Sequence, residues 1–387
     1  MRFLTLFLVC AALLLSQPPS LTPREAADGW ILLFDGESSF GWTPEGGAQW
    51  RIIDSAVTSE GSESGWLRTD SMFADYILKC EFRAGAAINS GLFLRSAREG
   101  DPGSTGYELN IWNQSPKYPT GSFVNIARAK RASFKPDQWN SYEVTAHGDH
   151  FVVVLNGKKV LDTHNSRSRI GYIGLQYNKN HPAAFRNIKL KPLGLKPIFN
   201  SKDLSGWQVV ASTRAKAPAE WSVKNGSIHV EKGPGQLETT GVYKNFVLQL
   251  DIMANAPDAT HHPNSGVFFR GDPNHLGSGY ESQIYNGYRD GDRTKPIDYG
   301  TGAIYNRVAT RKVVSSDNEY FTKTIIANGR RLAVWLNGYP VTDWEDPRPE
   351  GANARKEARF KEGPISFQAH DPTTNLDFKN IHIVELP

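Results

Sequence analysis

The sequence has very little cysteine and no concentrated charge. Its 387 residues include two cysteines, Cys10 and Cys80, and Cys10 lies in an amino-terminal apolar run that we expect to be removed. The mature chain is therefore expected to hold neither an intramolecular disulfide nor a cysteine metal site. The 44 Lys and Arg residues and the 40 Asp and Glu residues are dispersed along the chain. We expect no nucleic-acid partner, because binding along phosphates needs a clustered basic stripe.

Several common catalytic motifs are absent as well. The chain has no glycine-rich phosphate loop, no HExxH, no GxSxG and no CxxC. Helical periodicity of useful length is also missing. An enzyme of this sequence must therefore work with carboxylate, histidine, arginine and amide side chains.

The amino terminus has the pattern of a secretory leader. Arg2 precedes an apolar run from Phe3 to Leu15, and a polar stretch with prolines follows. A run of about 13 residues is too short to span a bilayer. We expect a signal peptide over residues 1–22, with the cut between residues 16 and 27, and export to the periplasm or the cell exterior. A buried helix or a retained anchor is the alternative. No other apolar stretch approaches membrane length.

One unit is written twice in the chain. Asn264 to Asn286 reads NSGVFFRGDPNHLGSGYESQIYN, and Asn89 to Asn113 reads NSGLFLRSAREGDPGSTGYELNIWN. Each copy has an Asn-Ser-Gly turn, a short strand ending in arginine, a loop, and a strand that begins Gly-Tyr-Glu. A Leu-Asn-Gly hairpin also recurs, at 155–157 and at 336–338. The repeat predicts two domains, 28–193 and 199–387, joined by a short linker at 194–198.

Apolar residues alternate with polar ones in both domains, which predicts β-strands buried on one face. Tyr76, Leu78, Cys80 and Phe82 form one such series. Each domain is expected to close on two strands, 172–177 and 184–190 in the first and 364–370 and 376–385 in the second. About 165 residues per domain suits a two-sheet β-sandwich. The predicted fold is all-β.

Strand alternation in the second copy gathers polar side chains on one face. It places Glu281, Gln283 and Tyr285 together. If the neighbouring strand pairs with theirs, Arg270 is expected near Glu281. A structural ion pair on the sheet surface is the alternative for these two residues.

A distant strand adds to this face in the second domain. Ser366, Gln368 and His370 alternate and are expected to point the same way. A carboxylate, a guanidinium, an amide and an imidazole on one face would suit a sugar. His370 is also the side chain best suited to move protons near neutral pH.

The first domain keeps only part of this set. Arg95, Glu108 and Gln176 are present, but Asn110 stands in place of Gln283 and Asn178 in place of His370. We therefore expect the first domain to bind or support and the second to react.

The adjacent histidines at 261 and 262 could indicate a metal site, with Asp258, Asp272 and His275 nearby in the sequence. Adjacent residues on an extended chain point in opposite directions, so a shared ion is the less favoured interpretation. Solvent-exposed loop histidines are the alternative.

A set of motifs carries a family resemblance. They are LFDG at Leu33, the NSG turns with their trailing arginine, GYE-x-Q at Gly279, TGAIYN at Thr301, the hairpin at Trp335, and the closing GPISFQAHDPTTNLDFKNIHI. With these the chain resembles two tandem copies of the 3-keto-disaccharide hydrolase domain, the second copy more closely. The resemblance implies concanavalin-like jelly-roll β-sandwiches and hydrolysis of glycosides oxidised at C3 of a sugar.

The resemblance also implies roles for residues of the second domain. A 3-keto group acidifies the C2 proton, so the glycosidic bond at C1 can break by elimination and water can add back. This chemistry needs a base, a stabiliser of the enolate oxygen and an acid. His370 or Glu281 would be the base and Arg270 the enolate stabiliser. The substrate-binding residues would be Gln283, Tyr285, Tyr305, Trp335 and Gln368.

Two questions stay open at this point. A divalent metal at the substrate carbonyl would be a cofactor consistent with the resemblance, although the sequence shows no firm ligand set for one. A tandem glycan-binding, lectin-like protein without turnover is the rival to the enzyme, because jelly rolls host both. A surface adhesion domain is a third reading. The sequence leaves the oligomeric state undetermined.

Overall fold

The structure is a computed structural model that describes residues 20–130, 133–212, 218–351 and 356–387. Most of the expected signal peptide at 1–22, with Cys10, lies outside the described residues. The first described element is the short helix α1 (Pro23–Ala27), which Thr22 and Glu25 cap reciprocally. Among the helices that the structure describes, none is long and apolar enough to cross a membrane.

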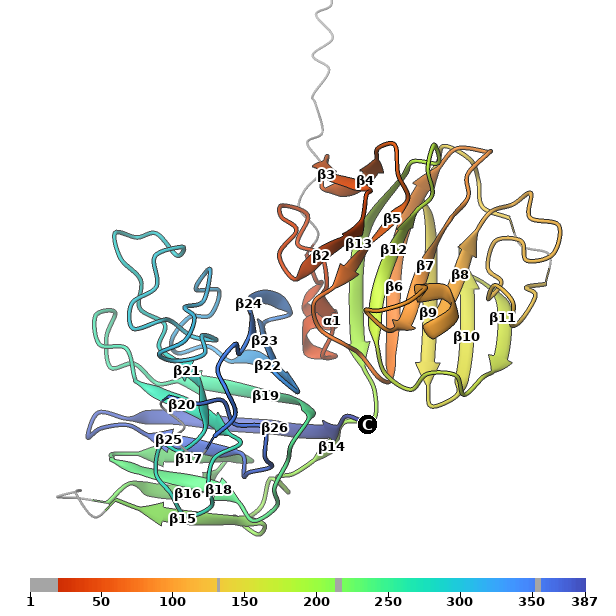
Figure 1. Cartoon of the computed structure of the whole chain (residues 1–387). Helices are drawn as coiled ribbons and strands as arrows, with labels where there is room; N and C mark the ends of the chain where they lie inside the picture. Colours follow the sequence, from red (N-terminus) through yellow and green to blue (C-terminus); the bar gives the residue numbers. More distant parts are fainter. Residues whose placement is uncertain (1–19, 131–132, 213–217, 352–355) are drawn as a thin grey trace, which may run out of the picture.

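The first domain is a sandwich of two antiparallel sheets (Figure 1). The larger sheet has the order β11-β10-β9-β6-β13-β4-β3, with β1 also paired to β13. Its strands are β1 (Ile31–Leu32), β3 (Gln49–Ile53), β4 (Ala56–Glu60), β6 (Tyr76–Ala84), β9 (Asn140–His147), β10 (His150–Leu155), β11 (Lys158–His164) and β13 (Ala183–Pro192). The smaller sheet, in the order β2-β5-β12-β7-β8, consists of β2 (Trp42–Gly46), β5 (Gly65–Thr69), β12 (Tyr172–Tyr177), β7 (Ser90–Ser96) and β8 (Tyr107–Ile111). The one-turn helix α2 (Pro102–Thr105) precedes β8.

The second domain repeats this plan (Figure 1). Its larger sheet has the order β16-β17-β26-β19-β22-β23-β24, with β14 also paired to β26. The strands are β14 (Lys196–Pro197), β16 (Glu220–Lys224), β17 (Ser227–Glu231), β19 (Phe246–Ala254), β22 (Phe321–Asn328), β23 (Arg331–Leu336), β24 (Tyr339–Glu345) and β26 (Asn375–Glu385). The smaller sheet, in the order β15-β18-β25-β20-β21, consists of β15 (Trp207–Ala211), β18 (Gly235–Thr239), β25 (Ser366–Ala369), β20 (Ser265–Phe269) and β21 (Tyr280–Ile284). The prediction of an all-β chain with two tandem jelly-roll sandwiches is confirmed.

Alternation along the strands builds the two cores. In β6, residues 76, 78, 80 and 82 are all buried, while the residues between them are partly exposed. The closing strands of each domain, expected as a pair, do not pair with each other. β12 lies in the smaller sheet and β13 in the larger one, and β25 and β26 are separated in the same way. The chain therefore crosses between the layers at the end of each domain.

The two sandwiches share a packed interface. The expected linker at 194–198 is not a free connector, because β14 within it pairs with β26 of the second domain. Val247, Ile326, Ala333 and Trp335 of the second domain pack into the core of the first. Gln249 donates a hydrogen bond to the carbonyl of Gly29 at 2.8 Å. The domains are thus held against each other by apolar and polar contacts.

Trp335 belongs to this interface and not to a sugar site. Its side chain is buried, and its Nε1 donates to the carbonyl of Leu32 at 2.8 Å. It lies on β23 in the larger sheet, whereas the predicted polar face belongs to the smaller one. The expectation that Trp335 binds substrate does not fit this placement.

Candidate active site of the second domain

The smaller sheet of the second domain carries a row of polar side chains on its outer face. The register places Phe268 opposite Glu281, and Gly266 opposite Gln283. On the next strands Gln236 lies opposite Gln368, and Glu238 opposite Ser366. Directly opposed residues of antiparallel strands point to the same face. This arrangement brings Glu281, Gln283 and Gln368 together, as the alternation of the sequence predicts.

Gly266 makes room for the carboxylate at the centre of this face. A Cβ atom at residue 266 would lie 2.4 Å from Oε1 of Glu281. Any side chain at this position would therefore push the carboxylate away. Gly266, which the sequence analysis placed in a turn, lies within β20 and has a packing role beside Glu281.

The carboxyl group of Glu281 is a weaker acid than an ordinary glutamate. Burial and the negative charge of Asp298 raise the pKa of its carboxyl to about 8, while the charge of Lys323 acts in the opposite direction. Desolvation penalises the ionised form, and a nearby like charge does the same. Near neutral pH this group is poised to gain or lose a proton, which is what acid–base catalysis requires.

Lys323 lies directly beneath the strand of Glu281. It is fully buried on β22, and its Nζ donates to the Gln283 carbonyl at 2.8 Å and to the Ser282 carbonyl and hydroxyl at 3.1 and 3.2 Å. Burial lowers the pKa of this amine to about 7, against the opposing effect of Glu281. The sequence analysis missed Lys323. Its signal was a lysine at a core-facing position, between Phe321 and Ile325, in an alternating strand.

Asp298 provides a second carboxylate at the same face. Its Oδ2 accepts hydrogen bonds from Gln283 Nε2 at 2.8 Å and from Asn264 Nδ2 at 3.2 Å. The negative charge of Asp298 also acts on the Tyr305 phenol. Asp298 belongs to the loop around 290–301 in which the second copy is longer than the first. It was not among the predicted site residues, because strand alternation says nothing about side chains in loops.

A cavity of about 200 Å³ opens above Glu281. Phe268, Glu281, Tyr305, Arg307 and Gln368 line it, together with residues 277, 279, 280 and 306. The Oε1 atom of Gln368 is buried and accepts no hydrogen bond from the part of the chain that the structure describes. Burial and the charge of Asp298 raise the pKa of the Tyr305 phenol, so it keeps its proton. The cavity thus combines a carboxyl group, a phenol, a guanidinium and an amide acceptor.

Arg270 does not share this face, contrary to expectation. It follows the end of β20 with φ of 56°, so the alternation of the strand does not extend to it. Its side chain is fully buried and donates to the carbonyls of Lys244 and Gly329 at 2.7 Å and to Asn245 Oδ1 at 3.0 Å. Arg95 in the first domain has the same conformation and a matching set of bonds. Arg270 therefore clamps loops of the sandwich, and Arg307 is the arginine in the cavity.

His370 lies outside the cavity. β25 ends at Ala369, and the His370 side chain is 45% exposed with its Nδ1 2.8 Å from Asp371 Oδ2. Its predicted role as a catalytic base does not fit this placement. Tyr285 also lies outside the cavity lining, where its ring packs edge-on against His262.

The residues tested for a metal site do not converge. His261 pairs with Asp258, whereas His262 pairs with Asp317, and His275 faces the carbonyl of Pro273. Within the described ranges, no group of three or more His, Cys, Asp or Glu side chains could hold an ion. Glu281 and Asp298 thus have no third His, Cys, Asp or Glu side chain beside them among these residues.

The first domain lacks most of the reactive groups. Thr120 and Thr301 begin the equivalent Thr-Gly turns, and both bond the equivalent asparagine. The two threonines are 301 − 120 = 181 residues apart, and this offset aligns the two copies over the loop and strand that follow. At this offset the four residues Asp298, Tyr305, Arg307 and Lys323 correspond to Lys117, Val124, Ile126 and Tyr142. Of the group around Glu281, the first domain keeps the carboxyl itself, as Glu108, and the amide of Gln176.

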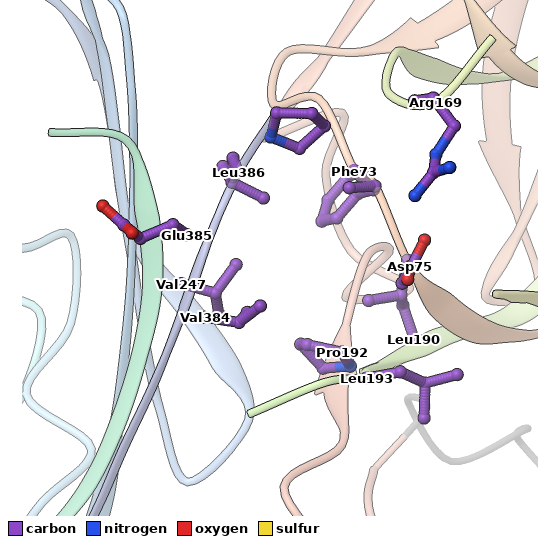
Figure 2. Close-up of a pocket in the computed structure, with 12 residues that line it drawn as sticks. Phe73, Asp75, Arg169, Leu190, Pro192, Leu193, Val247, Val384, Glu385 and Leu386 are labelled. Carbon is purple, nitrogen blue, oxygen red and sulfur yellow. The ribbon is translucent and has the colours of Figure 1, made fainter. Parts of the chain in front are cut away.

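A cavity of about 330 Å³ with a mixed apolar and charged lining lies between the domains, away from Glu281 and Asp298. Figure 2 shows Phe73, Leu190 and Pro192 of the first domain facing Val247 and Val384 of the second, with Asp75 and Arg169 at one side. It has no acid–base pair of the kind found at Glu281. We therefore take the polar face of the second domain as the candidate site.

Comparison with known proteins agrees with this architecture. The family model of the 3-keto-alpha-glucoside-1,2-lyase-like domain matches residues 29–191 and again residues 194–384. The chain belongs to this family. The match in two segments confirms the predicted tandem copies and supports a carbohydrate-related function.

Solved structures with a similar fold match part of the chain, between 38% and 51% of it among those considered. One is a candidate glycosyl hydrolase from Parabacteroides distasonis ATCC 8503, at 22% identity and a TM-score of 0.41, which covers 46% of this chain and 100% of that one. Another is the carbohydrate binding module CBM66 from Bacillus subtilis, at 20% identity and a TM-score of 0.33, over 38% and 94% of the two chains. These likenesses concern the fold alone. No curated protein matches the sequence significantly.

Proposed function

We propose that the second domain cleaves 3-keto-glycosides, including 3-keto-disaccharides, by elimination followed by hydration. The observation that carries this proposal is Glu281, a partly buried carboxyl group whose pKa is raised by desolvation and by Asp298, in a cavity that Tyr305 and Arg307 also line. A binding site needs no group poised to exchange a proton near neutral pH. The family match supports this substrate class.

Glu281 is the base in this mechanism. Its carboxylate takes the proton from C2 of the 3-keto sugar, and the electron pair of the C2–H bond forms an enolate with the C3 carbonyl. The raised pKa makes Glu281 a stronger base than an ordinary carboxylate. The Arg307 guanidinium lines the same cavity and stabilises the negative charge that develops on the C3 oxygen.

Tyr305 is the acid. When the enolate collapses, the C3 carbonyl re-forms, a double bond forms between C1 and C2, and the bond from C1 to the leaving oxygen breaks. The Tyr305 phenol gives its proton to that oxygen. Water then adds its hydroxide to C1 and returns its proton to Tyr305, while protonated Glu281 returns a proton to C2. The net reaction is hydrolysis, and both residues end as they began.

Lys323 and Gln283 position the reacting groups. The buried amine of Lys323 holds the backbone of residues 282 and 283 and favours the ionised form of Glu281. Gln283 ties the strand to Asp298. Gln368 offers its unused Oε1 to a substrate hydroxyl. The leader-like amino terminus supports a site of action outside the cytoplasm.

The test is release of the leaving sugar. The full mature chain is incubated with 3-keto-disaccharides and with their unoxidised parents, each with and without a chelator. The proposal expects release from the 3-keto substrates alone, at a rate that the chelator does not change. Binding of glycans without release from any 3-keto substrate would instead support the lectin-like alternative.

A further inference from the structure

The first domain has a cavity of its own at the position equivalent to the site of the second. It is larger, at about 450 Å³, and its lining includes Glu108, Asn110, Trp112, Tyr118 and Gln176. Glu108 corresponds to Glu281, and Trp112 follows Ile111 as Tyr285 follows Ile284. The first domain therefore lacks most of the polar groups of the second-domain site but keeps an open cavity at the equivalent position.

Two buried acceptor atoms in this cavity have no partner within the described part of the chain. They are Oδ1 of Asn110 and Oε1 of Gln176. Asn110 is only 2% exposed, and its amide nitrogen is already fixed by the carbonyl of Tyr118 at 2.5 Å. Its oxygen is thus held in place without a donor. A buried acceptor without a donor is costly to a protein, and a ligand that supplies hydroxyl groups removes this cost.

The walls around these acceptors suit a sugar ring. Trp112 is half-buried at the cavity, which leaves part of its ring available for the C–H face of a pyranose. Lys117 and Glu108 also line the cavity and carry opposite charge types. Hydroxyl donors, an apolar face and no strong net charge together describe a neutral saccharide.

Turnover is not expected at this position. Lys117 reverses the charge of Asp298, and Val124 replaces the phenol of Tyr305. Tyr142 takes the place of Lys323 and donates to the Asn110 carbonyl at 2.8 Å, which keeps the strand in place without a buried charge. The copy retains the means to hold a sugar but not the means to move its protons.

We propose that the first domain is a non-catalytic binding site for neutral saccharides. Its ligand hydroxyls donate to Asn110 Oδ1 and Gln176 Oε1 while the ring lies against Trp112. The first domain would hold a glycan next to the reacting domain, against which it packs. This inference stands apart from the proposed turnover, since it concerns residues of the other domain.

The experiment measures binding of maltose, cellobiose and trehalose to the full chain by calorimetry and saturation-transfer NMR. The variants are Trp112→Ala and Gln176→Met, and the matched control is Tyr285→Ala, which removes the aromatic residue at the equivalent position of the second domain. We expect at least one sugar to bind, and each first-domain variant to weaken binding about tenfold, the loss of roughly one good contact. Tyr285→Ala should leave the affinity unchanged, and both first-domain variants should still cleave 3-keto substrates if the second domain is active.

Two results would overturn the proposal. One is failure of all three sugars to bind the wild-type chain. The other is retention of full affinity by Trp112→Ala and Gln176→Met, or an equal loss in Tyr285→Ala. Because Trp112 is half-buried at the surface, its variant is expected to fold, and unchanged cleavage by the second domain would report this. Failure of cleavage with sugar binding intact would refute the proposed function and leave this proposal standing.

Discussion

Replacing Lys323 by methionine tests the buried charge beneath the site. The amine is fully buried, with its pKa lowered to about 7 from a usual value of 10.5. Between these two values the unfolded chain holds the proton more tightly than the folded chain, so raising the pH favours the folded state. The penalty of burying the ammonium is fully present below pH 7 and is relieved as the pH rises toward 10.5.

The size of the effect follows from the shift. Each pH unit in this window is worth about 1.4 kcal/mol, so from pH 7 to pH 9.5 the wild type should gain about 3 kcal/mol of unfolding free energy relative to Lys323→Met. Glu281 enlarges this difference between the wild type and the variant. Because its pKa is raised, its contribution to the free energy of unfolding falls as the pH rises through about 8 in the wild type. Without the Lys323 charge the pKa of Glu281 is higher still, so in the variant this fall continues to higher pH.

The assay is urea unfolding of both proteins from pH 6.5 to 9.5. Tyr142→Phe is the matched control, because it removes the equivalent donor in the first domain and burial keeps the pKa of Tyr142 well above its usual value. The control should differ from the wild type by a constant amount at every pH. Parallel curves for wild type and Lys323→Met would refute the account of this lysine.

Four further predictions concern Arg270, Trp335, His370 and Glu281. Arg270→Ala should lower the free energy of unfolding by about 3–5 kcal/mol, because a large, fully buried side chain is removed and the loops at residues 244, 245 and 329 lose their common hydrogen-bond donor; in urea unfolding, a change below about 1 kcal/mol would contradict its clamping role. Trp335→Ala should lower the free energy of unfolding by about 3–5 kcal/mol, because it leaves a cavity in the domain interface. An unchanged Tm in calorimetry would contradict the role of Trp335 in that interface. His370→Ala should change kcat/KM by no more than about twofold, as expected for an exposed side chain. A loss of activity would show that His370 belongs to the active site. The kcat/KM of the wild type should rise with pH through about 8, where Glu281 ionises, and a fall through this pH would make Glu281 the acid instead.

Local pattern was enough to predict the fold and three of the side chains on the polar face of the second domain. Period-two alternation and the internal repeat indicated two sandwiches, because one face of each strand must be buried wherever a sheet covers a core. The same alternation brought Glu281, Gln283 and Gln368 to one face, since residues two apart on a strand point the same way. These inferences depend only on neighbours along the strand.

The remaining residues depend on conformation or on packing between distant segments. Arg270 leaves the pattern because a single positive φ ends the alternation. Lys323 reaches the site from the opposite sheet, across the core, and Asp298 arrives on a loop. Trp335 resembles a sugar platform in the sequence, but its partner is the other domain. For Lys323 the sequence did contain a signal, because a lysine at a core-facing position of a strand is unusual.

The central claim is that the second domain reacts through Glu281 and the first does not react through Glu108. The measurement is the rate of leaving-sugar release from a 3-keto-disaccharide by Glu281→Gln and by Glu108→Gln, two isosteric changes at equivalent positions. The account predicts that Glu281→Gln lowers kcat by about 10²–10⁴-fold, the usual contribution of a general base, and that Glu108→Gln leaves kcat unchanged. Full activity in Glu281→Gln, or equal losses in the two variants, would contradict it.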